Sequence, residues 1–359
     1  MASFYSVFQK IVVTLWLENS IKFGRLQLKV LILNVFLAGF VALTLRAQDA
    51  AFSQFYANPM YLNPAYAGNT ECGRLNLNYR NQWPSVSNAY VTYSLAYDQS
   101  LAAINSGYGL MVMNDQQGYG AYNRTAINAY YSYQLRLTSS TNLSFGVRGA
   151  YYQEKLAWEK LTFASQLASK IDPNDIDTYE DMPKNNQIST VDFGAGLLFG
   201  YEDAFFAGVA ADHLTQPQLG FYETESIPLD LKLTVHAGAV INLTEGGFGR
   251  YRQDDITIEP NVMFVNQGIF SQLNAGVYVN MYPFVFGGWF RHAFENIDAA
   301  MLLVGINYNN FRIGYSYDFT LSEIGANTGG AHEISLAWDF CILKAPKKRS
   351  VRTIKSPGF

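Results

Sequence analysis

Four histidines are the residues of this chain best suited to acid–base chemistry or metal binding. They are scattered over the sequence, at His213, His236, His292 and His332. Glu333 follows His332, but the second histidine that a zinc-protease helix requires is missing. The sequence also has no Gly-x-Ser-x-Gly turn, the usual setting of a hydrolase serine. We therefore expect a protein that is not an enzyme and whose histidines make structural hydrogen bonds.

The signals for cofactors, metals and nucleic acid are equally weak. The glycines between Gly194 and Gly200 have the wrong spacing for a dinucleotide loop, and no phosphate-binding loop is present. The acidic stretch 172–177 offers oxygen ligands for Ca²⁺ but lacks the glycine and distal glutamate of a calcium-binding hand. We interpret it as a solvated loop. A net charge of -4 provides no basic surface for nucleic acid, so we expect no cofactor, no metal and no nucleic-acid partner.

The elements that must position any functional side chain are strands. The 359 residues include 25 Tyr, 25 Phe and 29 Gly, a composition that favours strands over helices. From Leu75 onward, apolar and polar residues alternate with period two, as in strands with one apolar and one polar face. The alternation predicts fourteen strands, near residues 73–83, 89–98, 106–114, 124–137, 142–154, 189–201, 204–213, 230–243, 255–265, 271–280, 284–292, 299–308, 311–319 and 331–341.

This pattern predicts an all-β fold, an outer-membrane antiparallel β-barrel of about 14 strands over residues 73–341. Short connections such as 202–203 alternate with long ones such as 155–188, which puts both termini in the periplasm if the long loops face outward. A soluble β-sandwich would show similar alternation. The barrel is favoured because aromatic residues gather near strand ends and the last strand closes with Trp338-Asp339-Phe340.

Charged residues on the polar side of the strands are expected to face the lumen, since an Arg or Lys facing lipid at mid-membrane costs about 2–4 kcal/mol. The lumen charges that we single out are Arg312, Asp318, Glu333 and Asp339. One interpretation is a lumen that selects a solute. The interpretation that we favour is a lumen closed by ion-paired side chains.

The first residues have the pattern of a secretory signal. Basic residues precede an apolar run, residues 30–45, which ends near a small residue suited to cleavage. The run is shorter than the roughly 20 residues of a spanning helix. We interpret residues 1–47 as a signal peptide, of which residues 1–27 are expected to lie upstream of the true start, and residues 48–72 as a periplasmic N-terminal segment. Export points to the outer membrane of a Gram-negative bacterium.

The two cysteines and the end of the chain carry further predictions. Cys72 precedes the first strand and Cys341 ends the last, and these strands must pair to close a barrel, so a disulfide is expected in an oxidising compartment. Residues 342–359 form a basic periplasmic tail without any acidic residue. We expect the tail to dock onto an acidic surface of a partner through Lys344, Lys347, Lys348, Arg349, Arg352 and Lys355.

Several stretches are more specific than the periodicity. They are Phe52-Ser-Gln-Phe-Tyr-Ala-Asn-Pro-Met-Tyr-Leu-Asn-Pro-Ala-Tyr-Ala-Gly68, Arg80-Asn-Gln-Trp-Pro84, His213-Leu-Thr-Gln-Pro217, Gly314-Tyr-Ser-Tyr-Asp318 and His332-Glu-Ile-Ser-Leu336. Together they resemble the PorP/SprF family of type IX secretion system outer-membrane proteins. The resemblance implies a barrel that works with the secretion and gliding machinery in the lipid membrane. SprF-like members support export or surface attachment of a cognate secreted adhesin. The alternative is an outer-membrane diffusion channel or small-molecule transporter.

Overall fold

The computed structural model describes residues 49–70, 73–86, 90–161, 185–221, 227–244, 246–249, 252, 254–294, 296–321, 328–341 and 354. The predicted signal peptide and the acidic stretch 172–177 lie outside this part of the chain. Three short helical turns come first, and strands account for most of the residues after them. Within the described residues, no helix is long and apolar enough to cross a membrane.

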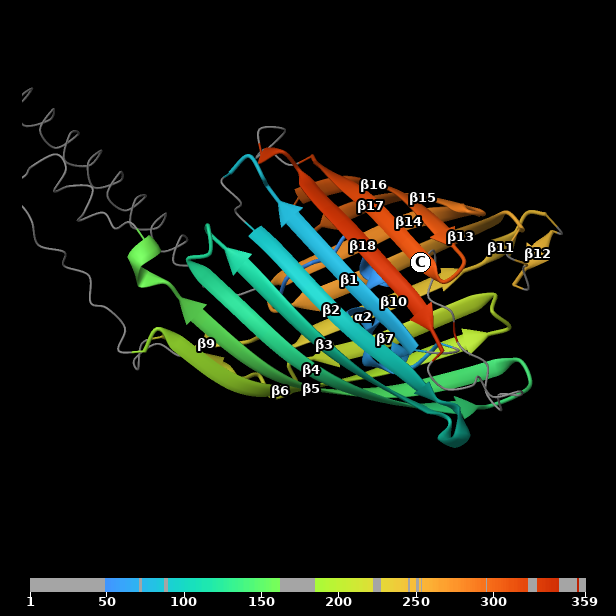
Figure 1. Ribbon diagram of the computed structural model, residues 1–359, viewed down its shortest axis with the longest axis horizontal. Coiled ribbons are helices and arrows are strands. Elements are labelled where there is room, and N and C mark those ends of the chain that lie inside the picture. The colour runs from blue at the N-terminus through green and yellow to red at the C-terminus, as the bar shows by residue number, and fades with distance from the viewer. Residues whose placement is uncertain are drawn as a thin grey trace, which may run out of the picture. The chain divides into compact units, whose positions relative to one another are not determined.

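Fourteen long strands form a closed antiparallel ring (Figure 1). They are β1 (Gly73–Gln82), β2 (Tyr90–Leu101), β3 (Ser106–Gln117), β4 (Tyr122–Arg136), β5 (Thr141–Leu156), β6 (Gln187–Tyr201), β7 (Phe205–Asp212), β10 (Lys232–Ala239), β13 (Thr257–Gln267), β14 (Phe270–Met281), β15 (Phe284–Ala293), β16 (Asn296–Tyr308), β17 (Phe311–Thr320) and β18 (Ala331–Phe340). Each pairs with the next in this order, and β1 pairs with β18 to close the ring. The predicted 14-strand barrel is therefore confirmed.

Shorter elements decorate the connections between the long strands. They are β8 (Gln218–Leu219), β9 (Ile227–Pro228), β11 (Ile241–Asn242), β12 (Gly247–Phe248), η3 (Ala102–Ile104) and η4 (Trp158–Lys160). The predicted strand 230–243 is divided, because β10 ends at Ala239 and the chain resumes as β11. On β13, pairing with β10 ends at Asn261 and pairing with β11 begins at Ile258. Pro260, which has no N–H to donate, lies in this gap.

The outer face of the barrel is apolar and exposed, as the alternation predicts. Leu95, Val112 and Ile127 are examples, each more than two-fifths exposed. Aromatic rings gather where the last strand ends: Trp338 stacks on Phe311, with ring centroids 5.7 Å apart. An apolar belt bordered by aromatic rings is the surface of a barrel that lies in a lipid membrane.

The two ends of the barrel differ in the length of their connections. At one end β1 begins and short turns join β6 to β7 and β16 to β17; we call it the turn end. At the other end β5 and β6 are joined through residues 157–186, and we call it the loop end. The position of an inward side chain along the lumen can therefore be described by the end that it lies nearer to.

Candidate functional site: a plugged lumen

Residues 49–70, which we call the plug, lie inside the barrel (Figure 1). The plug contains η1 (Phe55–Ala57), α2 (Pro59–Leu62) and η2 (Pro64–Tyr66). All residues from 52 to 69 are buried except the half-buried Tyr61. We interpreted residues 48–72 as a periplasmic N-terminal segment, and the part of it that the structure describes, residues 49–70, lies in the lumen of the barrel. The physical reason is that this segment carries many large apolar side chains, whose exposure to water is unfavourable.

Two Asn-Pro pairs give the plug its compact shape. Pro59 and Pro64 each open a helical turn, a position at which the missing N–H costs nothing. Asn63 caps the second of these turns, because its Oδ1 accepts the Ala65 N–H at 2.9 Å. The Asn63 Nδ2 also donates to the Leu197 carbonyl of β6 at 2.9 Å. The same residue therefore shapes the plug and joins it to the wall.

A row of small residues on the wall makes room for the plug. They occupy directly paired positions on β3 to β7, at Gly107, Ser132, Gly146, Gly196 and Ala210. A Cβ atom at Gly146 would overlap the backbone of Ala65, and one at Gly196 would overlap the Asn63 side chain. The Ser132 hydroxyl donates to the Ala67 carbonyl at 2.6 Å. The wall is therefore shaped to the second half of the plug.

The first half of the plug is held near the loop end by a carboxylate on β18. Both oxygens of Glu333 accept plug backbone N–H groups, from Ser53 at 2.7 Å and from Gln54 at 3.0 Å. Arg80 of β1 pairs with Glu333 at 3.2 Å and with Asp318 of β17 at 3.0 Å. All of these side chains are buried. The predicted lumen charges Asp318 and Glu333 are thus brought together around Arg80 and face the plug.

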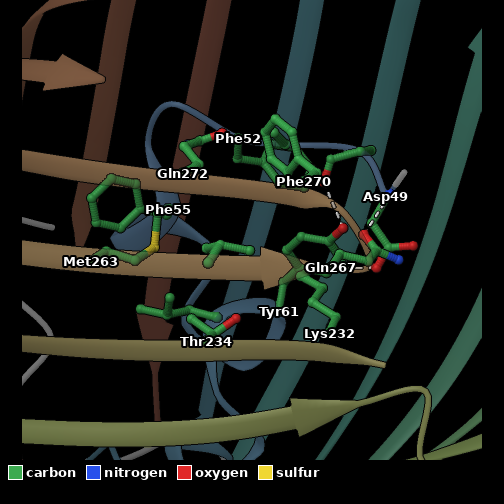
Figure 2. A pocket seen from close by; sticks show the side chains of 14 residues that line it. Asp49, Phe52, Phe55, Tyr61, Lys232, Thr234, Met263, Gln267, Phe270 and Gln272 are labelled. Carbon is green, nitrogen blue, oxygen red and sulfur yellow. Dashed lines mark hydrogen bonds and ion pairs between the residues drawn. The ribbon is translucent and has the colours of Figure 1, made fainter. Parts of the chain in front are cut away.

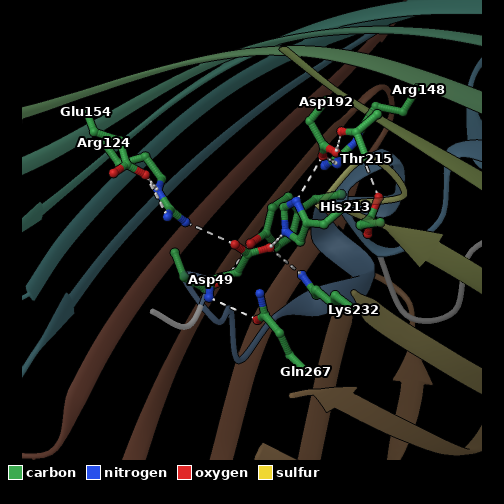
Figure 3. A network of polar contacts seen from close by, with 12 residues as sticks. Asp49, Arg124, Arg148, Glu154, Asp192, His213, Thr215, Lys232 and Gln267 are labelled. Atoms are coloured by element: carbon green, nitrogen blue, oxygen red, sulfur yellow. Dashed lines mark hydrogen bonds and ion pairs between the residues drawn. The ribbon is translucent and has the colours of Figure 1, made fainter. Parts of the chain in front are cut away.

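A second anchor holds the first described residue of the plug (Figure 3). The Asp49 carboxylate lies 3.1 Å from Arg124, 2.9 Å from His213 Nε2 and 3.3 Å from Lys232. Two of these partners also have a further contact on the wall: Glu154 pairs with Arg124 at 2.7 Å, and Asp192 pairs with His213 at 2.9 Å. The charges of this anchor are therefore largely balanced within it.

The anchor shifts the pKa values of two groups that lie outside the spanning strands. Burial alone would lower the pKa of His213, but Asp49 and Asp192 outweigh this effect and raise it. Burial would raise the pKa of Asp49, but His213, Lys232 and Arg124 hold it well below its usual range. Both shifts favour the ion pair, because each partner stabilises the charged form of the other.

The turn end holds the last residues of the plug. The Gly68 N–H donates to Asp98 at 2.9 Å, and Arg74 pairs with the same carboxylate at 2.9 Å. Ile354 is the described residue of the C-terminal tail; it is buried, and its N–H donates to Asn69 Oδ1 at 2.9 Å. The tail was expected to lie outside the barrel. At Ile354, however, it contacts the plug, because this side chain is apolar.

Of the remaining predicted residues, the structure describes Arg312, Asp339 and Cys341, which lie at the turn end. Arg312 and Asp339 pair with each other at 2.8 Å. Cys341 follows Phe340, which pairs with Gly73, whereas Cys72 is outside the described residues. The Cys72–Cys341 bridge therefore stays a prediction. The basic tail residues are also outside the described part: Lys344, Lys347, Lys348, Arg349, Arg352 and Lys355.

The polar groups of the site are arranged to hold a peptide segment. Both ring nitrogens of His213 face carboxylates, Asp192 and Asp49, each at 2.9 Å. His236 lies 3.3 Å from Asn63 of the plug and packs beside Tyr66. In the part of the chain that the structure describes, no three His, Cys, Asp or Glu residues are grouped to hold a metal ion.

The sequence interpretation missed the plug and its second anchor. Residues 49–70 show no period-two alternation, and this region contains the two Asn-Pro pairs. The high proportion of large apolar residues in this segment could have indicated that it is buried, because apolar side chains are stabilised only when they are removed from water. The partners Arg124 and Lys232 gave no comparable signal, because an inward charge has the same sequence pattern whatever it faces.

Several solved structures are similar to this chain in fold. Solved structures of similar fold include the CymD monoaromatic hydrocarbon channel, with 11% identity and a TM-score of 0.45 over 82% of this chain and 95% of that one. They also include the Ralstonia pickettii toluene transporter TbuX, with 12% identity and a TM-score of 0.42 over 78% and 93%. These likenesses concern the fold alone.

Sequence comparison identifies the family. Among curated proteins, no sequence matches this chain. Residues 44–338, which include the plug and nearly all of the barrel, match the family described as type IX secretion system membrane protein PorP/SprF. The membrane surface of the barrel fits this description. The chain therefore belongs to the PorP/SprF family of type IX secretion system membrane proteins, and its place is the outer membrane.

Proposed function

We propose that this protein is a non-enzymatic platform of the type IX secretion system that supports export or surface attachment of a cognate secreted adhesin. In this proposal the turn end, where β1 begins and β18 ends, faces the periplasm, and the loop end, near which Asp49 of the plug lies, faces the outside. The secretion machinery binds at the turn end, and the adhesin binds at the loop end. The lumen itself is not the route of the exported chain.

The observation that supports this proposal most is that a chain of a secretion family keeps its lumen filled by its own plug. Glu333 and Asp49 hold the plug near the loop end, and Asp98 holds it at the turn end. Barrels that pass solutes by diffusion have a water-filled lumen. A plugged barrel has its two rims available for binding instead, and partners at the rims are what a platform requires.

A diffusion channel is the second candidate, and one observation favours it. Much of the contact between plug and wall is polar: Asn58 donates to Ser94 at 3.2 Å, and Ser132 donates to Ala67 at 2.6 Å. Release of the plug would therefore open a hydrophilic lumen. The two candidates differ in what the loss of the protein does: a channel affects small-solute uptake, and a platform affects one large surface protein.

The experiment is a clean deletion, with the adhesin measured at the cell surface by antibody labelling of intact cells. A neighbouring gene that encodes a very large repetitive secreted protein would supply the adhesin to monitor. We expect its surface amount to fall at least tenfold while other exported proteins stay unchanged, and the wild-type gene to restore it. Unchanged display together with altered small-solute uptake would overturn the platform in favour of the channel.

The basic tail is proposed to bind an acidic periplasmic surface of the machinery. Replacing its six Lys and Arg residues by Gln keeps Ile354 and its contact with Asn69, but removes the charge. We expect display of the adhesin to fail, because attraction between charges of opposite sign is lost. Replacing the four tail lysines by arginine is the matched control and should preserve display. Normal display by the Gln variant would leave the tail without this role.

A further inference from the structure

A cavity lies between the plug and the wall near the loop end (Figure 2). Three strands supply its outer side in two paired rows. Lys232, Gln267 and Phe270 form the row nearer the loop end. Thr234, Val265 and Gln272 form the row below it. The plug supplies the inner side, chiefly through Phe52, Phe55, Tyr61 and Leu62. The cavity therefore exists only while the plug is in place.

The size of the cavity suits a small molecule. It measures about 60 Å³, on a scale in which one water needs roughly 10–15 Å³. From Met263 to Gln267, successive inward residues of β13 line its length, which is about 14 Å at a rise of roughly 3.4 Å per residue. A single six-membered ring with a short substituent matches these dimensions.

The lining is apolar over most of its area. Phe52, Phe55, Leu62, Met263 and Val265 provide only carbon, hydrogen and sulfur. Water in such a cavity would find few of the two to four polar partners that it normally requires. An apolar molecule would instead exchange water contacts for packing against these side chains, which is the main favourable contribution to small-molecule binding.

The polar end of the cavity selects for a neutral head group. Lys232 lies 3.3 Å from the Asp49 carboxylate and 4.5 Å from the centre of the Tyr61 ring, so its charge is already compensated. An anionic ligand would add a charge that nothing balances. Gln267 is buried, and its Oε1 accepts the Asp49 N–H at 3.1 Å. Its Nε2 has no hydrogen-bond partner among the described residues.

We propose that this cavity binds a small neutral molecule with an apolar ring-sized body and one hydrogen-bond acceptor, which takes the N–H of Gln267. The ligand touches the plug on one side and the wall on the other. Because it binds only the plugged barrel, it stabilises the plug by mass action. This site is independent of the proposed role in secretion, and its test uses the isolated protein.

The test is isothermal titration of the full chain in lipid nanodiscs, with empty nanodiscs as the reference for partitioning. The probes are acetophenone, toluene, which lacks the acceptor, and benzoate, which is charged. We expect acetophenone to bind one site, and toluene to bind roughly fivefold more weakly, the effect of one net hydrogen bond. Benzoate is expected to bind more weakly still. If none of the probes binds beyond the empty nanodiscs, the cavity holds water only and the proposal fails.

Two variants on the same strand locate the site. Val265→Phe fills the cavity from β13 and should abolish acetophenone binding. Val262→Phe places the same ring on the exposed outer face of β13 and should leave binding unchanged. Binding that survives Val265→Phe would place the ligand elsewhere and overturn the assignment.

Photolabelling of the unaltered protein locates the ligand without any substitution, and therefore still tests the proposal if Val265→Phe does not fold. A diazirine derivative of acetophenone is photolysed in the nanodisc, and the labelled peptides are identified by mass spectrometry. We expect label on plug residues 52–62 and on wall residues 263–272, reduced by excess acetophenone. Label confined to outward residues of the barrel would contradict the proposal.

Discussion

Removal of the Glu333 carboxylate should release the first half of the plug. Glu333 is fully buried and accepts the Ser53 N–H at 2.7 Å, the Gln54 N–H at 3.0 Å and an Arg80 N–H at 3.2 Å. Glu333→Ala leaves two buried N–H groups without an acceptor, and Arg80 retains only Asp318 as its pair in this anchor. Breaking one partner out of a buried ion pair costs about 3–5 kcal/mol. We expect plug docking to weaken by this amount.

The assay measures how often the plug opens. A cysteine placed at Ala57, which is buried in the plug, is labelled with a maleimide in purified protein, and the labelled site is identified by mass spectrometry. A loss of about 3–5 kcal/mol corresponds to labelling that is roughly two to four orders of magnitude faster, since labelling depends on local opening. The second anchor at Asp49 remains, so the barrel itself should keep its heat-modifiable gel mobility.

Asp339→Ala is the matched control for this prediction. Asp339 lies on the same strand and the same inward side as Glu333, but it pairs with Arg312 and its side chain is 40% exposed. We expect labelling at Ala57 to stay within a fewfold of the unaltered rate in this variant. Equal labelling rates for the Glu333 and Asp339 variants would refute the reasoning, because the Glu333 carboxylate would then not hold the plug.

Three further predictions concern other contacts of the plug and the barrel. Gly146→Val should displace the plug, at a packing cost of about 1–3 kcal/mol, and give conductance in planar bilayers, whereas Gly288→Val, with open space at its Cβ, should not. As pH rises above 6.5 and through the raised pKa of His213, this side chain loses its positive charge, and Asp49 keeps only Arg124 and Lys232 as charged partners. Hydrogen exchange at the start of the plug should then increase, and His213→Gln should remove this pH dependence. Cys72 and Cys341 should resist thiol labelling in unreduced, denatured protein, and labelling of both would exclude the bridge.

The strands were predictable because the two faces of a barrel wall meet different solvents. β1 was expected at 73–83 and spans Gly73–Gln82, and β18 was expected at 331–341 and spans Ala331–Phe340. Successive residues of a strand face lipid and lumen in turn, so apolar and polar residues alternate with period two along the sequence. The break after Ala239 was not predictable, since the residues on either side of it continue the same pattern.

The plug was not predictable from the same signal, because the sequence shows that a side chain points inward but not what it meets there. Glu333 was expected to face the lumen, yet its partner Ser53 is 280 positions away in the chain. In the sequence, Gly196 belongs to a group of glycines whose spacing does not fit a dinucleotide loop. The structure shows that the absence of a side chain at Gly196 of β6 leaves room for the Asn63 side chain of the plug. Contacts of this kind depend on tertiary packing, which local sequence patterns do not encode.

If the barrel acts as a platform while its lumen stays plugged, fixing the plug in the lumen should leave export of the adhesin intact. Asn58 of the plug donates to Ser94 of β2 at 3.2 Å. Cysteines at both positions, joined by a short bifunctional maleimide in cells that carry the adhesin, would fix the plug in the lumen, and each single cysteine serves as the control. Antibody labelling of the adhesin on intact cells is the measurement. We expect newly made adhesin to reach the surface in the same amount with the plug locked or free. A loss of display confined to the locked variant would show that the plug must move during export, and would overturn the plugged platform.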